Sequence, residues 1–458
     1  MNETTEQKIV SIIRAQKDFF NTRQTGDINF RIDTLKKLLQ AVKENEKKIA
    51  EALWSDLHKS FEEAYFTEIS LIYEEIKTHI RHVKKWAKRK SVSMPLHLKP
   101  SGGYILHEPL GVAFISAPWN YPFQLLINPL IGAISSGCCA VIKPSPYAIH
   151  TSQIIEDIIS SLFAENYIAV VQGGREVNEI LYRQPFDIIF FTGSPSLGKV
   201  VMKAASENLV PVVLELGGKS PCIVDKEAAI EVAAKRIAWG KCLNAGQTCI
   251  APDYLFVHQS VKEKLIEAII KSIKEMFGDD AKQSNYFPRI IRTEAVERLQ
   301  KLMQHGNIVY GGKVDKDEKY IEPTIIDNVD FSHPVMQEEI FGPLLPVLTF
   351  NNIEEVIGHL NNSAKPLAFY YFGKNKQAKE ILAQTTSGGG CINDTIMHVA
   401  THKLPFGGVG NSGMGKYHGY TSFLAFSNAR AIVDTPTWID LPFKYPPFKY
   451  FNKIKKIL

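Results

Sequence analysis

The sequence predicts an α/β protein built around parallel, doubly wound sheets. Between Gly111 and about residue 225, helical stretches alternate with apolar, β-rich runs: GVAFIS, CCAVIKP, YIAVV, DIIFFTG and LVPVVLEL. The alternation resumes over residues 226–410, and the turns between elements are short. Sheets of this kind bind ligands at the carboxyl ends of their strands, so functional residues are expected there.

The first 90 residues are predicted to be helical. Apolar residues recur at spacings of three and four, as in Ile32, Leu35, Leu38 and Leu39, and glycine and proline are nearly absent. The segment ends in the basic run RHVKKWAKRK, which is typical of a solvated helix end, where cations complement the helix dipole.

Residues 91–107 change character and predict a hairpin with a glycine turn at Ser101-Gly102-Gly103. An arm of this kind can cross to a partner subunit. Together with the segment near residues 424–434, it could pair across subunits by adding edge strands.

The second half is predicted to contain helices over 227–242, 261–277 and 375–385, and strands near 253–258, 344–350 and 367–372. Its glycines form clusters at 387–390, 406–410 and 411–415. Since glycine permits close backbone approach, these clusters indicate loops around a site, with flexible linkers as the alternative.

Composition narrows the class of protein. A chain of 458 residues is too long for one simple core, and its net charge of +5 lacks the concentrated basic footprint of nucleic-acid binding. The N-terminus has no apolar signal core, and no apolar run reaches the roughly 18 residues of a membrane-spanning helix. Six cysteines occur without a CxxC pair or metal-ligand spacing, so we expect a reduced, cytoplasmic protein without a metal site.

Two strand ends are candidates for binding a phosphate or ribose. In FTGSPSLG (191–198), Gly193 and Gly198 would allow a tight turn, and the following helix would offer free N–H groups to a phosphate. The spacing is not GxGxxG, and a plain strand–turn–helix junction also needs glycine. In VIKPSP, Lys143 could bond ribose or phosphate, or simply be solvated.

Three further residues are candidates for catalysis. Cys249 lies in the polar loop NAGQTC, where nearby backbone N–H groups would lower its pKa and favour a nucleophilic thiolate; the other five cysteines fit buried thiols. Glu215, in LELGGKSP, would be partly desolvated and a better general base, or else cap a turn or pair with a lysine. Asn120, in PWNYP, could donate to an oxyanion or act as a helix N-cap.

Seven segments occur in one order: PWNYP, KPSP, FTGS, LELGGKSP, GQTC, EEIFGP and PFGGVGNSGMG. From about residue 50 to 430 the chain resembles the aldehyde dehydrogenase superfamily, closest to the class 3 enzymes, which include fatty-aldehyde and coniferyl-aldehyde dehydrogenases. The resemblance implies a Rossmann-like cofactor domain (1–90 and 108–213), an α/β catalytic domain (214–412), a small β bridging arm (91–107 and 413–435) and a C-terminal tail (436–458).

The resemblance also implies roles at matching positions. Cys249 would be the nucleophile, Asn120 would stabilise the oxyanion with the Cys249 backbone N–H, and Glu215 would be a general base. The cofactor, NAD or NADP, would be held by Lys143, Gly193, Ser194, Gly198, Leu216, Gly217, Glu339 and Phe341. Glu339 and Phe341 would hold the nicotinamide ribose and ring.

The implied reaction is oxidation of an aldehyde, of medium to long chain, to an acid through a thiohemiacetal and a thioester on Cys249. Class 3 relatives imply a homodimer. Two other interpretations remain: a thioester hydrolase or esterase that uses Cys249, and a non-catalytic, membrane-associated protein. An intact nucleophile, base and oxyanion donor argue against the second, because a scaffold needs none of them.

Two questions remain open at the level of the sequence: the choice between NAD and NADP, and the identity of the base that activates water. Family members often read KPSE where this chain reads KPSP, and Pro146 removes a glutamate that would repel a 2′-phosphate, so strict preference for NAD is in doubt. The base that activates the deacylating water is either Glu215 or Glu339.

The tail from about residue 434 carries aromatic residues beside lysines, a combination that suits a weak membrane contact or a gate at the substrate entrance. Packing against the chain's own domains or a partner subunit is the alternative. Pro442, Pro446 and Pro447 would interrupt any long helix there.

Overall fold

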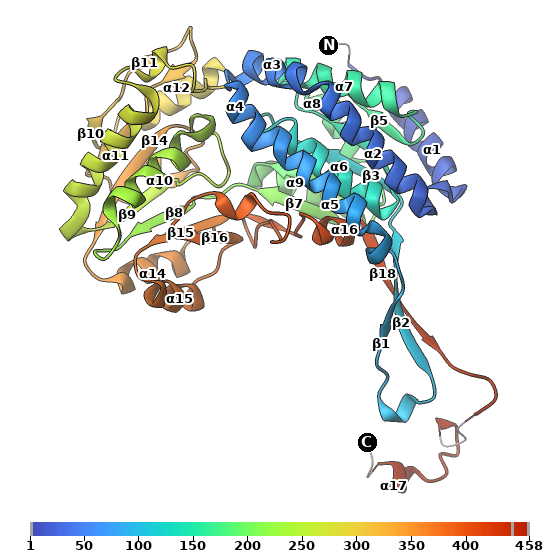
Figure 1. Ribbon diagram of the computed structural model, residues 1–458. Coiled ribbons are helices and arrows are strands. Elements are labelled where there is room, and N and C mark those ends of the chain that lie inside the picture. The colour runs from blue at the N-terminus through green and yellow to red at the C-terminus, as the bar shows by residue number, and fades with distance from the viewer. Residues whose placement is uncertain (1–2, 441–443, 456–458) are drawn as a thin grey trace.

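The computed structural model describes residues 3–440 and 444–455. Two α/β units lie side by side, and a long β arm projects from the unit that contains the N-terminal half of the chain (Figure 1). The predicted α/β class with parallel sheets is confirmed.

The first unit is built on a sheet with the strand order β17-β7-β6-β3-β4-β5. All neighbours are parallel except β17, which runs antiparallel to β7. Residues in the central strands are buried on both faces, which explains their unbroken apolar sequence. The strands are β3 (Val112–Ser116), β4 (Cys139–Lys143), β5 (Ile168–Val170), β6 (Ile188–Gly193), β7 (Val212–Leu216) and β17 (Gly413–Met414).

Helices surround this sheet, and the predicted helical N-terminus is confirmed. Its apolar stripes supply core residues such as Leu35, Leu38 and Leu53, each fully buried. The helices of this unit are α1 (Glu6–Asn21), α2 (Ile28–Glu44), α3 (Glu46–Leu57), α4 (Phe61–Ala64), the π-helix η2 (Tyr65–Ile69), α5 (Ser70–Trp86), α6 (Gln124–Ser136), α7 (Ile149–Leu162), α8 (Arg175–Tyr182), α9 (Pro195–Ser206) and α16 (Tyr420–Ala425).

The second unit has a sheet with the order β10-β13-β14-β9-β8-β15-β16, parallel except for the β10–β13 pair. The helices and strands predicted for this half are confirmed to within about three residues. Its strands are β8 (Pro221–Val224), β9 (Tyr254–His258), β10 (Asn307–Tyr310), β13 (Thr324–Asp327), β14 (Leu344–Phe350), β15 (Ala368–Phe372) and β16 (Gly389–Ile392), beside a small pair, β11 (Val314–Asp315) and β12 (Tyr320–Ile321). Its helices are α10 (Ile230–Cys242), α11 (Lys262–Phe277), α12 (Thr293–Leu302), α13 (Pro334–Gln337), α14 (Ile353–Asn362) and α15 (Asn375–Gln384).

The arm is an antiparallel sheet of β1 (Lys90–Val92), β2 (Gly102–Pro109) and β18 (Ser427–Asp434). The predicted hairpin is therefore present, and β18 pairs with β2 along its whole length, from Ser427 opposite Pro109 to Asp434 opposite Gly102. Most side chains of β18 are exposed.

Two features of the predicted domain division differ from the structure. The domain boundary expected between residues 213 and 214 lies inside β7, and β17, expected in the arm, pairs with β7. The tail includes α17 (Phe451–Ile454) and lies near the far end of the arm (Figure 1). Pro442, named in the tail prediction, lies outside the described residues, as do Phe443 and Lys456, two of the tail's aromatic residues and lysines. Within the described ranges, no helix is both long and apolar enough to cross a membrane.

Candidate functional site

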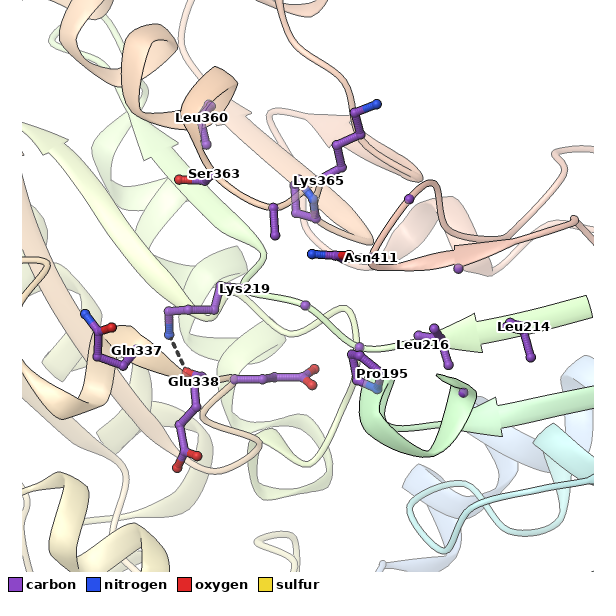
Figure 2. Close-up of a pocket in the computed structure, with 18 of the residues that line it drawn as sticks. Pro195, Leu214, Leu216, Lys219, Gln337, Glu338, Leu360, Ser363, Lys365 and Asn411 are labelled. Atoms are coloured by element: carbon purple, nitrogen blue, oxygen red, sulfur yellow. Dashed lines mark hydrogen bonds between the residues drawn. The ribbon is translucent and has the colours of Figure 1, made fainter. Parts of the chain in front are cut away.

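A cavity of about 630 Å³ lies between the two units, where the strands of the first sheet end. Figure 2 shows Pro195, Leu214 and Leu216 of the first unit on one side, and Lys219 and Glu338 of the second unit facing them. The lining includes Gly198, Leu216, Gly217 and Glu339, four of the residues predicted to hold a cofactor. This agrees with the expected position of a ligand at the carboxyl ends of the strands.

The N-terminus of α9 forms one wall of this cavity. Ser194 is its N-cap, and the Ser194 hydroxyl accepts a hydrogen bond from the Leu197 backbone N–H at 3.4 Å. Gly198 does not serve a tight turn, as the sequence suggested, because it lies inside α9, where a Cβ would come within 2.7 Å of the Leu216 side chain. Glycine here lets the helix approach β7 closely. Gly193 ends β6, and a Cβ on it would lie 2.5 Å from the Phe191 ring.

Lys143 ends β4 and is not the solvated lysine of the alternative interpretation. Only 2% of it is exposed, and its ammonium group donates to the Pro144 carbonyl at 3.2 Å. Burial lowers its pKa to about 8, because the charged form is poorly solvated. A buried cation at a strand end, with a single hydrogen-bond acceptor among the described residues, is suited to bond a polar ligand.

Glu339 faces Gly217 across the cavity. A Cβ at Gly217 would lie 2.0 Å from Oε2 of Glu339, so only glycine leaves room for this carboxyl group. Burial, then the nearby Asp253 carboxylate, raise the pKa of Glu339 to about 8. Asp253 also anchors the segment, because its Oδ1 accepts from the Ile340 N–H at 3.0 Å and its Oδ2 accepts from Lys219.

Phe341 follows in the same segment. Its ring meets the Trp119 ring edge to face, with centroids 5.4 Å apart. Phe341 has a positive φ of 51°, an uncommon conformation for a bulky residue that indicates a tightly specified loop. The contact links the segment around Glu339 to the PWNYP turn.

The loop that carries Cys249 is held by the side chain of Gln247, which is fully buried. Its amide donates to the carbonyls of Asn244 and Arg289, at 3.0 and 2.9 Å, and its oxygen accepts from the Ile291 N–H at 3.0 Å. Beyond the cysteine, the Tyr370 hydroxyl donates to the Ile250 carbonyl at 2.5 Å. The glutamine of GQTC is therefore a loop anchor.

Cys249 itself differs from the sequence prediction in one respect. Backbone N–H groups of Cys249 and Ile250 do lower its pKa, as expected, but burial raises it more, and the carboxyl groups of Glu339 and Glu215 raise it further. The net effect is a raised pKa, so the predicted lowering is wrong for the protein alone. Cys249 is half-buried, and its thiol lies near enough to both carboxyl groups for each of them to affect its pKa.

Glu215, in β7, is 2% exposed. Within the described chain neither of its carboxyl oxygens has a hydrogen-bond partner, and burial raises its pKa well above the usual range, with Lys416 as the opposing charge. The turn-capping alternative is therefore excluded. The alternative of a pair with a lysine holds only as an electrostatic interaction with Lys416. The Lys416 ammonium group donates its hydrogen bonds to the carbonyls of Gly388 and Gly407 instead of to Glu215.

Asn120 precedes α6 but does not cap it, since α6 begins at Gln124 after Phe123. It is 2% exposed, and its Nδ2 donates to the Gln247 carbonyl at 3.0 Å. Asn120 therefore lies at the loop of Cys249. Glu215 and Glu339 lie near the same loop, because their carboxyl groups affect the pKa of the Cys249 thiol.

Several polar residues at the site were missed by the sequence reasoning. Lys416 and Lys241 are examples; Lys241 is 3% exposed, its ammonium group has no hydrogen-bond partner among the described residues, and burial lowers its pKa to about 8. A lysine in the otherwise apolar stretch AWGKCL was the available signal.

These residues fit a nicotinamide dinucleotide. The cavity is of ligand size, glycine at positions 198 and 217 lets α9 and the Glu339 carboxyl group approach the end of β7 closely, and the buried Lys143 ammonium group adds a donor at the end of strand β4 of the same sheet.

The chain is similar to known proteins in both sequence and structure. The model of the aldehyde dehydrogenase family matches residues 1–432. The chain is 49% identical to the 4,4'-diaponeurosporen-aldehyde dehydrogenase of Staphylococcus aureus, over 94% of this chain and 95% of that protein. It is 42% identical to the dimeric NADP-preferring aldehyde dehydrogenase of Canis lupus familiaris, over 96% and 98%. A solved structure of Staphylococcus aureus AldH in a substrate-bound state, 47% identical, superposes with a TM-score of 0.96 over the full length of both chains.

Proposed function

Because this chain belongs to the aldehyde dehydrogenase family and is an NAD(P)-dependent enzyme of it, we propose that it oxidises its aldehyde through a covalent bond to Cys249. The observation that carries the proposal is the convergence on the Cys249 loop of an amide donor, Asn120, and two buried carboxyl groups, Glu215 and Glu339. The other five cysteines lack this setting. Cys138, Cys139, Cys222 and Cys242 are buried, and Cys391 lies against His398 instead.

In the first step, the sulfur of Cys249 bonds to the aldehyde carbon and the thiol proton passes to a neighbouring carboxylate. The raised pKa of the thiol makes this transfer necessary, because little thiolate exists in advance at neutral pH. The carbonyl oxygen becomes an alkoxide, stabilised by the backbone N–H of Cys249 and by the Asn120 amide. Asn120 has one N–H committed to the Gln247 carbonyl and a second N–H for this purpose.

When bound, the nicotinamide cofactor supplies the acceptor for the hydride that leaves the tetrahedral carbon. Lys143, Gly193, Ser194, Gly198, Leu216 and Gly217 would hold its phosphates and adenosine portion, and Glu339 and Phe341 its nicotinamide portion. Loss of hydride leaves a thioester on Cys249.

Water then releases the acid. Glu215 takes a proton from the attacking water, the water oxygen bonds to the acyl carbon, and the carbon–sulfur bond breaks. The proton held by Glu215 then passes to the departing sulfur, which restores both the thiol and the carboxylate. Both oxygens of Glu215 are free of hydrogen bonds within the described residues, so they can accept from water. The raised pKa makes the carboxylate a stronger base.

For the substrate we propose an apolar aldehyde of medium to long chain. The support is a relative named for diaponeurosporen-aldehyde, and the aromatic tail. We further propose a homodimer that pairs through the arm, supported by the exposed β18 edge and by a relative described as dimeric. Light scattering of the full chain tests this, with a mass of two subunits expected and four contradicting it.

The substitution Cys249→Ser tests the proposal as a whole. The variant should form no reduced cofactor with aldehyde, and its cofactor affinity should match that of the wild type. Cys391→Ser is the matched control and should turn over normally. Wild-type turnover in Cys249→Ser would rule out the covalent route. Ester hydrolysis by the wild type, with no reduced cofactor formed when aldehyde is present, would instead support a hydrolase.

A further inference from the structure

A buried ion pair lies beneath the Asn120 turn and takes no part in the reaction proposed above. Lys59 follows α3 and Glu68 lies in the π-helix η2; their charged groups are 2.6 Å apart, and both side chains are 0% exposed. The desolvation cost of fully burying two charges offsets their mutual attraction, so such a pair contributes little net stability. Single-turn π-helices also occur frequently at functional sites.

Within the described residues, the other hydrogen bonds of the two charged groups are all made with one short segment, and the buried Glu63 carboxyl group is near enough for both charges to affect its pKa. The Lys59 ammonium donates to the backbone carbonyl of Asn120 at 3.1 Å and lies 4.0 Å from the centre of the Tyr121 ring. Oε2 of Glu68 accepts from the N–H groups of Phe123 and Gln124, at 3.0 and 3.1 Å. These two N–H groups begin α6 and have no partner within the helix, so the glutamate caps it.

The segment held in this way is joined to the cysteine loop at three points. The Asn120 carbonyl also accepts from the Asn244 side chain at 2.8 Å, and the Asn120 amide donates to the Gln247 carbonyl. The hydroxyls of Tyr121 and Thr248 are 2.6 Å apart. The position of the Asn120 amide relative to Cys249 is therefore fixed on one side by the ion pair and on the other side by the cysteine loop.

We propose that Lys59 and Glu68 are a positioning pair that holds the Asn120 amide where the alkoxide forms. Lys59 fixes the backbone of Asn120, and Glu68 fixes the start of the following helix. Neither residue touches the aldehyde or the cofactor. The inference rests on the proposed role of Asn120 as oxyanion donor.

The test is a double-mutant cycle on the hydride-transfer step, followed as the burst of reduced cofactor in the full-length enzyme. Lys59→Met should slow the burst by about 10²-fold, the loss expected from displacing a catalytic group by about 1 Å. The KM for aldehyde and the affinity for cofactor should stay near wild type. In an Asn120→Ala background, Lys59→Met should cause no further loss, because the amide that it positions is already gone.

A control separates positioning from general destabilisation. Lys262→Met removes a 2.7 Å ion pair with Asp327 in the second unit, where both side chains are 15% exposed, and should lower the melting temperature without changing the burst. If Lys59→Met does not fold, the cycle is run with Glu68→Gln, which keeps an acceptor for the two N–H groups and removes the charge. Rate losses that multiply in the double variant would overturn the inference. A wild-type burst in Asn120→Ala alone would instead overturn the oxyanion role itself.

Discussion

The side-chain amide of Asn120 donates a hydrogen bond to the backbone carbonyl of Gln247, two residues before Cys249, at 3.0 Å. Residues 127 positions apart in the sequence are thus joined at the point where an aldehyde oxygen would acquire charge. The same amide has a second N–H, and the backbone N–H of Cys249 is the other donor proposed there. In the proposed mechanism, the two donors would form one oxyanion site from two different α/β units.

Replacing Asn120 should therefore slow the chemistry and leave binding intact. Asn120→Ala is expected to lower the rate of hydride transfer by about 10²–10³-fold, the usual loss for one oxyanion donor. Single-turnover measurement of reduced cofactor gives this rate directly. A change in the KM for aldehyde with an unchanged rate would make Asn120 a binding residue. Asn128→Ala, a buried asparagine in α6, is the matched control.

Glu215 should be needed for every turnover after the first, because it activates the water that releases the acid. In Glu215→Gln the initial burst of reduced cofactor should persist, and the steady-state rate should fall by about 10²–10⁴-fold, because no base activates the water. Since the pKa of Glu215 is raised, thioester release in the wild type should accelerate as pH rises and the carboxyl loses its proton. The steady-state rate across pH measures this.

Glu339→Gln provides the comparison. The pKa of Glu339 is about 8, so this residue would produce a similar rise with pH if it were the base. Steady-state turnover that survives in Glu215→Gln and is lost in Glu339→Gln would assign the water activation to Glu339.

Cofactor choice should be relaxed in the wild type. Pro146 follows the buried Ser145 just after β4, at the position where the family resemblance implies a glutamate that would repel a 2′-phosphate. The enzyme should use both NAD and NADP, with a preference below about a thousandfold, or roughly 4 kcal/mol. Pro146→Glu should shift the ratio of kcat/KM towards NAD by at least about tenfold, or 1.4 kcal/mol. Pro146→Ala is the control and should keep the wild-type ratio; an equal shift in both variants would contradict the charge argument.

The tail should act on substrate access. Trp438, Tyr450 and Phe451 are exposed, and the tail lies by the far end of the arm, so these aromatic side chains do not pack into the chain's own units (Figure 1). In a dimer that pairs through the arms, the tail could reach the partner subunit's site. Deleting residues 436–458 should change the KM for long-chain aldehydes more than for short ones.

Two controls accompany this deletion. Sedimentation with anionic liposomes measures membrane contact by the full-length and shortened proteins. An equal change in KM across chain lengths, with no lipid binding by either protein, would leave the tail a purely structural role.

The sequence predicts the fold well because the fold depends on local patterns, and a local pattern also singles out Cys249, the proposed nucleophile. Buried parallel strands give unbroken apolar runs, and Cys249 lies in a polar loop that no core position would need. The raised pKa of Cys249 could not be predicted, because the burial of its thiol and the approach of Glu339 and Glu215 arise only in the folded chain. Lys59 and Glu68 were missed for the same reason, since a lysine and a glutamate near helices ordinarily indicate a solvated surface. Gly198 was assigned to a turn because the close approach of α9 to Leu216 has no local signature.

The most direct test of the account is to locate the acyl group. The full-length Glu215→Gln enzyme, mixed with cofactor and aldehyde and stopped in acid after the burst, should carry one acyl group per subunit. Peptide mass spectrometry should place it on Cys249 alone, and the double variant with Cys249→Ser should carry none. Acylation of another residue, or a full burst of reduced cofactor with Cys249 unmodified, would contradict the covalent mechanism.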